Sequence, residues 1–162
     1  MRTIKDYNLS PHFSLYEFIE GSSMSKKGHE MNWKYIDECD VGKLEQMAQR
    51  LEFLRDDINR NFKSDIDPTK SIGLQITSGW RCLAWELFRN RSGKGQHPIA
   101  AADVIPTNVS KELSDEIILW VYDKYNSRLR GWEGGFAIKR PTPSTTGFIH
   151  VDIRKENARW EY

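Results

Sequence analysis

The feature that most constrains the fold is a long amphipathic segment between Val41 and Phe62. Asp40 stands immediately before it and can cap its first turn. Its apolar residues recur at spacings of three and four, which predicts one apolar face of an α-helix; they are Leu44, Met47, Ala48, Leu51, Leu54 and Ile58. A helix with such a face must bury it against a second layer of structure.

A second helix signal lies near the start of the chain. Ser14 followed by Glu17 forms the pattern of a capping box, and Phe13 and Phe18 flank it as a hydrophobic staple. We therefore predict a short helix from Ser14 to about Ile19. The polar, Gly- and Ser-rich residues 21–31 predict a loop.

The remaining chain alternates between strand and helix patterns. Helices are predicted from Cys82 to about Asn90 and, capped by Ser110, from about Lys111 to Tyr125. Strands are predicted over four segments, the last two joined by a Pro/Thr/Ser loop: Gly73–Ser78, Ala102–Ile105 closed by Pro106, Gly131–Ile138 and Phe148–Ile153. These elements predict an α+β fold with a small, mostly antiparallel sheet packed against helices.

Length and composition fit one globular domain. The chain has 162 residues, so we expect one domain over 1–162, with residues 1–20 packing on its core. A net charge of +1 lacks the basic surplus of nucleic-acid binders. The longest apolar run, Ile117 to Tyr122, is far shorter than the ~20 residues that span a bilayer. Residues 1–6 lack the apolar region of a secretory signal, so we expect synthesis in the cytoplasm without a signal peptide.

Three polar residues far apart in the chain have the chemistry of a metal site. Asp103 lies in the apolar run Ala100–Val104, where a carboxylate is costly to bury unless it is paired or binds a metal. In the strand pattern around His150, that histidine and Asp152 project to the same face. His97, Asp103 and His150 together supply the two imidazoles and one carboxylate of an open zinc site. The alternative is three hydrogen-bonded core residues, and spacing alone does not separate the two interpretations.

Several ordered segments then suggest a family. They are Leu9–Phe18, Ile76–Arg81, Gly95–His97 leading to Asp103, Gly134–Phe136, Phe148–Arg154 and Ala158–Trp160. Together they resemble the D-Ala-D-Ala carboxypeptidase family of zinc peptidases (metallopeptidase family fifteen), particularly its small phage and bacterial members. The resemblance covers nearly the whole chain and implies a hedgehog/DD-peptidase-like fold.

The chain departs from the family pattern at three places. Gly95 stands where the family has serine. The spacing from His97 to Asp103 is one position shorter, and the intervening glycine is missing. Leu83–Leu87 replaces the asparagine and small residues that usually follow the segment ending at Arg81.

The resemblance implies a role for each site residue. Zn²⁺ would be held by His97, Asp103 and His150, and Arg81 would stabilise the oxyanion; a surface arginine paired with an acid is the alternative for Arg81. The family's general base has no counterpart before His150, so Asp152 is the nearest replacement, with orientation of an imidazole or metal ligation as alternatives. Gln96 is expected to hydrogen-bond substrate.

These expectations define a function. The chain is expected to be a monomeric, zinc-dependent peptidoglycan peptidase that cuts a cell-wall stem peptide at an amide next to a D-amino acid. It would act as a carboxypeptidase or endopeptidase after release or delivery, as a phage or prophage endolysin does. The alternative is a non-catalytic wall-binding or virion structural module on the same fold. Nucleic acid is excluded as a partner by the balanced charge.

Overall fold

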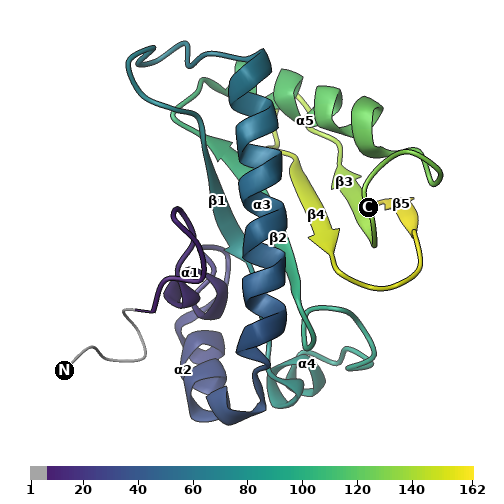
Figure 1. Ribbon diagram of the computed structural model, residues 1–162. Helices are drawn as coiled ribbons and strands as arrows, with labels where there is room; N and C mark the ends of the chain where they lie inside the picture. The colour runs from purple at the N-terminus through teal and green to yellow at the C-terminus, as the bar shows by residue number, and fades with distance from the viewer. Residues whose placement is uncertain (1–6) are drawn as a thin grey trace. The chain divides into compact units, whose positions relative to one another are not determined.

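A computed structural model describes residues 7–162 (Figure 1). The interpretation of residues 1–6 as lacking a secretory signal lies outside the described residues. The elements follow in the order α1 (Leu15–Ile19), α2 (Lys26–Lys34), the 3-10 helix η2 (Ile36–Glu38), α3 (Val41–Asn61), β1 (Gly73–Ser78), α4 (Leu83–Phe88), β2 (Ala101–Thr107), α5 (Lys111–Tyr125), β3 (Phe136–Lys139), β4 (Phe148–Asp152) and β5 (Arg159–Glu161). None of the helices in residues 7–162 combines the length and the apolar character that crossing a membrane requires.

The strands form one five-stranded sheet in the order β1-β2-β4-β3-β5, which confirms the α+β class. β3 and β4 are antiparallel, with Ala137 opposite His150. β3 and β5 are parallel, with Ala137 opposite Trp160. The sheet is therefore mixed. The prediction of a mostly antiparallel sheet is not confirmed beyond the β3–β4 pair, and β5, which pairs with β3 in parallel, was not predicted as a strand.

Contacts divide the chain into two compact units. Of the described residues, 7–52 and 76–102 form one unit, and 53–75 and 103–162 form the other. The helix α3 and the strands β1 and β2 each contribute residues to both units.

In the first unit, α1 begins as the sequence predicts. The capping box is present: the Ser14 hydroxyl accepts from the Glu17 N–H at 3.3 Å, and the Glu17 carboxylate accepts from the Ser14 N–H at 2.8 Å. Phe13 and Phe18 are both buried, as a staple requires. The segment therefore packs on the core of its unit.

The predicted loop over residues 21–31 is wrong from Lys26 onward, where α2 begins. Ser25 caps this helix by accepting from the Gly28 N–H at 3.3 Å. A Cβ at Gly28 would lie 3.0 Å from the Trp85 ring, so the glycine permits close packing of α2 on α4. The helix is thus stabilised by tertiary packing, which overrides its weak local propensity.

The helix α3 confirms the amphipathic pattern. The Asp40 carboxylate accepts from the Lys43 N–H at 3.2 Å, as predicted for the cap. The six apolar residues of its predicted face are completely buried: Leu44, Met47, Ala48, Leu51, Leu54 and Ile58. The apolar face therefore lies in the core as the period predicts.

In the second unit, α5 begins at the predicted cap, with the Ser110 hydroxyl accepting from the Leu113 N–H at 3.1 Å. It packs on β3, beside β4 and β5 (Figure 1). The strand β2 continues through Pro106, so the predicted stop there is wrong, since proline's φ is compatible with extended backbone. The predicted strand from Gly131 is also wrong until Phe136, because Gly134 has a φ of +110°.

Candidate metal centre

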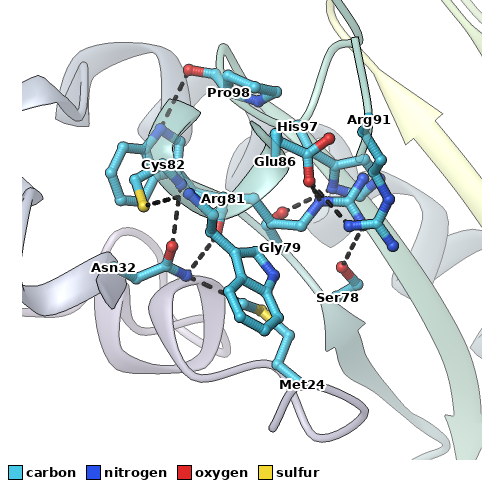
Figure 2. A network of polar contacts seen from close by, with 12 residues as sticks. Met24, Asn32, Ser78, Gly79, Arg81, Cys82, Glu86, Arg91, His97 and Pro98 are labelled. Atoms are coloured by element: carbon cyan, nitrogen blue, oxygen red, sulfur yellow. Dashed lines mark hydrogen bonds and ion pairs between the residues drawn. The ribbon is translucent and has the colours of Figure 1, made fainter. Parts of the chain in front are cut away.

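His97 lies just before β2, and its imidazole is fixed by the backbone. Nδ1 is 2.6 Å from the Gly79 carbonyl oxygen, so Nδ1 carries the proton and donates it (Figure 2). Nε2 is then the nitrogen whose lone pair suits a metal ion. The backbone carbonyl of His97 accepts from the Arg81 N–H at 3.2 Å, which ties the same residue to the turn after β1. The ring is buried, as the ligand interpretation requires.

Gly79 sets the position of that carbonyl. A Cβ at this residue would overlap the Phe18 backbone. The turn therefore packs directly on α1, which the capping box positions. The orientation of the His97 ring thus depends on close packing of backbone against backbone.

His150 lies on β4 and contacts two carboxylates of its own unit. Its Nδ1 is 2.7 Å from Asp103 Oδ1, and its Nε2 is 3.2 Å from Asp152 Oδ2. Its side chain is 3% exposed and that of Asp103 14%. The contact with Asp152 confirms that both residues project from the same face of the strand.

The three predicted ligands come together. Within residues 7–162, His97, Asp103 and His150 each offer one ligand atom, and these atoms lie within 4.8 Å of one another. Two imidazoles and one carboxylate leave a coordination position open, as in catalytic metal sites. The group could therefore hold a metal ion. The same donors suit several divalent ions, so they do not by themselves select zinc.

Asp152 is completely buried and densely hydrogen-bonded. Its Oδ1 accepts from the Gly135 N–H at 2.8 Å and from the Arg154 N–H at 3.1 Å. The Arg154 guanidinium donates to both carboxylate oxygens, with Nε at 2.9 Å and 3.0 Å and Nη2 at 2.5 Å. Burial alone would raise the pKa of Asp152, but the bonds from His150, Arg154 and Gly135 outweigh it and hold that pKa well below its usual range.

The carboxylates also act on His150. Burial alone would lower the pKa of the imidazole, but the hydrogen bonds and charges of Asp103 and Asp152 outweigh it and raise the pKa above its ordinary 6.5. Each ring nitrogen of His150 faces a carboxylate oxygen, Nδ1 that of Asp103 and Nε2 that of Asp152. If Nδ1 binds a metal, Nε2–H still donates to Asp152, the arrangement that fixes a ligating histidine.

Two glycines lie against Asp152, Gly135 at its carboxylate and Gly134 at its backbone carbonyl. A Cβ at Gly135 would overlap the Asp152 carboxylate itself. Gly134 adopts a positive φ of +110° that favours glycine. The sequence signal for these contacts is the Gly134–Gly135 pair, which also belongs to the segments that resemble the family. The partner Arg154 was missed as a functional contact, although it stands two residues after Asp152.

Arg81 is 15% exposed at its side chain and pairs with an acid. Its Nε lies 2.9 Å from Glu86 Oε1, and its Nη1 donates to the Ser78 hydroxyl at 3.3 Å. The alternative of an acid-paired arginine is thus present, but the side chain is not on the surface. Glu86 was missed as a partner of the site; its signal was an acid between Trp85 and Leu87 in a predicted helix.

Gln96 and the C-terminal aromatic residues complete the surroundings. Gln96 is half-buried next to His97, and its carbonyl accepts from the Ile99 N–H at 2.9 Å. The Trp160 ring lies 5.0 Å from the His150 ring between centroids, and the Tyr162 ring lies 6.2 Å from it. Two aromatic rings therefore lie next to His150 in the second unit.

Comparisons of the chain with models of protein families, with curated proteins and with solved structures find no match. The functional interpretation consequently depends on the geometry of the site and on the ordered segments of the sequence.

Proposed function

We propose that this chain is a zinc-dependent peptidoglycan peptidase that hydrolyses a stem-peptide amide next to a D-amino acid, as a carboxypeptidase or endopeptidase. The observation that carries the proposal is the group of His97, Asp103 and His150, two of them buried, with ligand atoms within 4.8 Å of one another. Membership of the D-Ala-D-Ala carboxypeptidase family, with its hedgehog/DD-peptidase-like fold, is part of the proposal. So is a monomer that acts on the wall after release or delivery by a phage or prophage.

The three ligands would hold the ion through defined atoms. His97 would bind through Nε2, because its Nδ1 donates to the Gly79 carbonyl. His150 would bind through Nδ1, because its Nε2 faces Asp152. Zinc bound there would polarise the scissile carbonyl and lower the pKa of a bound water to about 7. The tautomer of His97 is fixed before the metal arrives. At His150 both ring nitrogens face a carboxylate, so a metal at Nδ1 would take the place of a proton there while Nε2–H stays on Asp152.

Arg81 would supply the fixed positive charge for the oxyanion. A guanidinium stays protonated at all working pH values, so its charge does not depend on the state of the metal-bound water. The ion pair with Glu86 and the bond to Ser78 hold it in one orientation. Fixed donors aimed at a developing charge are the largest catalytic contribution in many enzymes.

The general base is predicted to be Asp152, but its contacts favour the alternative role. Both of its oxygens accept from Arg154, and Oδ2 also faces His150. A carboxylate with a depressed pKa and saturated oxygens is a poor proton acceptor. We infer that Asp152 orients His150.

The saturated state of Asp152 also favours a second candidate, a non-catalytic wall-binding or virion structural module. Such a protein would bind metal and wall fragments without turnover. It differs from the enzyme in one observable, the release of cleaved peptide. The same assay therefore separates the two candidates.

The test incubates purified cell-wall fragments with zinc-loaded protein and analyses them by mass spectrometry. The enzyme releases peptide products, loses this activity with a chelator, and regains it with Zn²⁺. A His150→Ala variant, whose folding is checked by circular dichroism, serves as the inactive control. If the fragments stay unchanged although one zinc is bound per chain, the protein is not a peptidase and the non-catalytic module is the better interpretation.

A further inference from the structure

We propose that Glu86 is a positioning residue that holds the Arg81 guanidinium in its working orientation; this inference rests on the proposed function. Glu86 lies on α4, outside every segment that the sequence assigned to the site. The carboxylate contacts two arginines: Oε1 is 2.9 Å from Arg81 Nε and 3.0 Å from Arg91 Nη1 (Figure 2).

Glu86 is buried, so its carboxylate interacts with the two arginines more than with water. The side chain is 5% exposed, while those of Arg81 and Arg91 are 15% and 43% exposed. A buried carboxylate keeps its charge only where partners offset the loss of hydration. The inner partner is Arg81 and the outer one is Arg91, so the two arginines are unequal in their access to water. Removing Arg91 leaves the inner pair in place.

The helix α4 is itself rigidly placed. Cys82 precedes it, and its N–H donates to the Asn32 side chain at 2.9 Å. Asn32 is completely buried and also donates to the carbonyls of Ile19 and Trp80. One asparagine thus connects α1, α2 and the turn that carries Arg81. Glu86 therefore projects from a helix whose start is anchored by buried hydrogen bonds.

Orientation matters because an arginine side chain is long and flexible. Arg81 is fixed at three points: its N–H donates to the His97 carbonyl, its Nη1 donates to Ser78, and its Nε pairs with Glu86. The first of these points joins it to a candidate metal ligand. Without Glu86, the terminal part of the side chain loses its charged anchor, and the positive charge is no longer preorganised for the transition state. The expected effect is on kcat more than on KM.

The experiment measures kcat, KM for cell-wall fragments, zinc content and thermal midpoint for five proteins: wild type, Glu86→Gln, Arg81→Met, the double variant and Arg91→Gln. We expect Glu86→Gln to lower kcat about 10-fold with KM and zinc content within twofold. Arg81→Met should lower kcat roughly 10²–10³-fold, the loss typical of one oxyanion donor. The double variant should be no worse than Arg81→Met, because Glu86 acts through Arg81. The matched control Arg91→Gln should stay within twofold of wild type.

Three results would overturn the inference alone: an unchanged kcat in Glu86→Gln, losses that multiply in the double variant, or an equal loss in Arg91→Gln. If Glu86→Gln does not fold, Glu86→Asp decides instead, since it keeps the charge but shortens the reach; full kcat in that variant overturns the inference. A wild-type protein that holds zinc but leaves the fragments intact overturns the proposed function, and this inference with it.

Discussion

The two candidate histidine ligands are supported in different ways. In the first unit, Nδ1 of His97 bonds to an uncharged backbone carbonyl, at Gly79. In the second unit, Nε2 of His150 faces the buried Asp152 carboxylate, which in turn pairs with Arg154. One ring is held by the path of the main chain and the other by a charged network. The two should therefore fail under different perturbations, sterics for His97 and charge for His150.

The largest effect should come from removing either ring. His97→Ala and His150→Ala each delete one of three protein ligands, so we expect both variants to lose zinc and activity, by at least about 10³-fold in kcat/KM, because no Lewis acid remains. Zinc per chain after dialysis, by plasma emission spectrometry, checks the binding. If one variant keeps full zinc, that histidine is not a ligand, and the comparison between two differently supported ligands does not hold.

Glycine replacements compare the backbone packing that supports His97 with the charged network that supports His150. Gly79→Ala forces a methyl group into the Phe18 backbone, and Gly135→Ala forces one into the Asp152 carboxylate. Overpacking of this kind costs about 1–3 kcal/mol of unfolding free energy, and more where backbone must move. Gly79→Ala should be the more destabilising, because two backbone segments must separate to admit the methyl group, whereas Gly135→Ala displaces one hydrogen-bonded carboxylate. Urea unfolding of the two metal-free proteins measures the difference, and equal stability would contradict the distinction.

Charge removal should affect only the His150 side. Asp152→Asn keeps the shape but leaves Arg154 without its anion, and it weakens the fixation of His150 Nε2. Loss of such a supporting carboxylate typically lowers metal affinity about 10–100-fold. Competition with a zinc indicator dye gives the affinity. As the matched control, Asp57→Asn removes another buried, paired carboxylate of the same unit, which bonds Lys124 and Tyr125. It should leave zinc affinity unchanged, and an equal loss there would point to general destabilisation.

The charged network also predicts a pH dependence for the metal-free protein. The lowered pKa of Asp152 contributes stability that is present above its ordinary 3.8 and is lost as pH falls toward the lowered value. The raised pKa of His150 contributes stability that is present below its ordinary 6.5 and is lost as pH rises through the raised value. Stability measured in chelator should therefore decline on both sides of a plateau between about pH 4 and 6.5. In Asp152→Asn the acid-side decline should weaken, whereas an unchanged pH profile would count against the network.

The smallest effect is expected at an ion pair on the protein surface. Arg140 and Glu161 form a two-bond pair at 2.9 Å, with the arginine side chain 51% exposed. Exposed pairs contribute little because water screens them, so Arg140→Gln should leave the unfolding free energy nearly unchanged and zinc affinity intact. Salt should weaken this pair further. A loss of stability as large as that of Gly79→Ala would show that exposure is a poor guide to which ion pairs matter in this unit.

The sequence predicted the features that depend on local pattern. The capping box at Ser14, the cap at Ser110 and the apolar face of α3 are set within a few residues, and all three are confirmed. The alternation in β4 likewise placed His150 and Asp152 on the same face.

Features that depend on distant partners were not predictable in this way. The helix α2 contains a glycine that makes room for Trp85, more than fifty positions away, and the strand β5 pairs with β3 across an intervening strand in the sequence. Glu86 and Arg154 gain their roles from burial against specific partners, which no period reveals. The candidate ligands were predicted only because a carboxylate in an apolar strand is conspicuous and because ordered segments resemble a family.

X-ray absorption spectroscopy of the zinc-loaded protein tests the central claim most directly. The claim predicts one zinc per chain, a shell of nitrogen and oxygen atoms at about 2.0–2.1 Å, and the scattering signature of two imidazoles. One imidazole should disappear from that signature in any His97 or His150 variant that retains metal. A sulfur shell at about 2.3 Å, which would implicate Cys39 or Cys82, or a protein that takes up no zinc, would contradict the account.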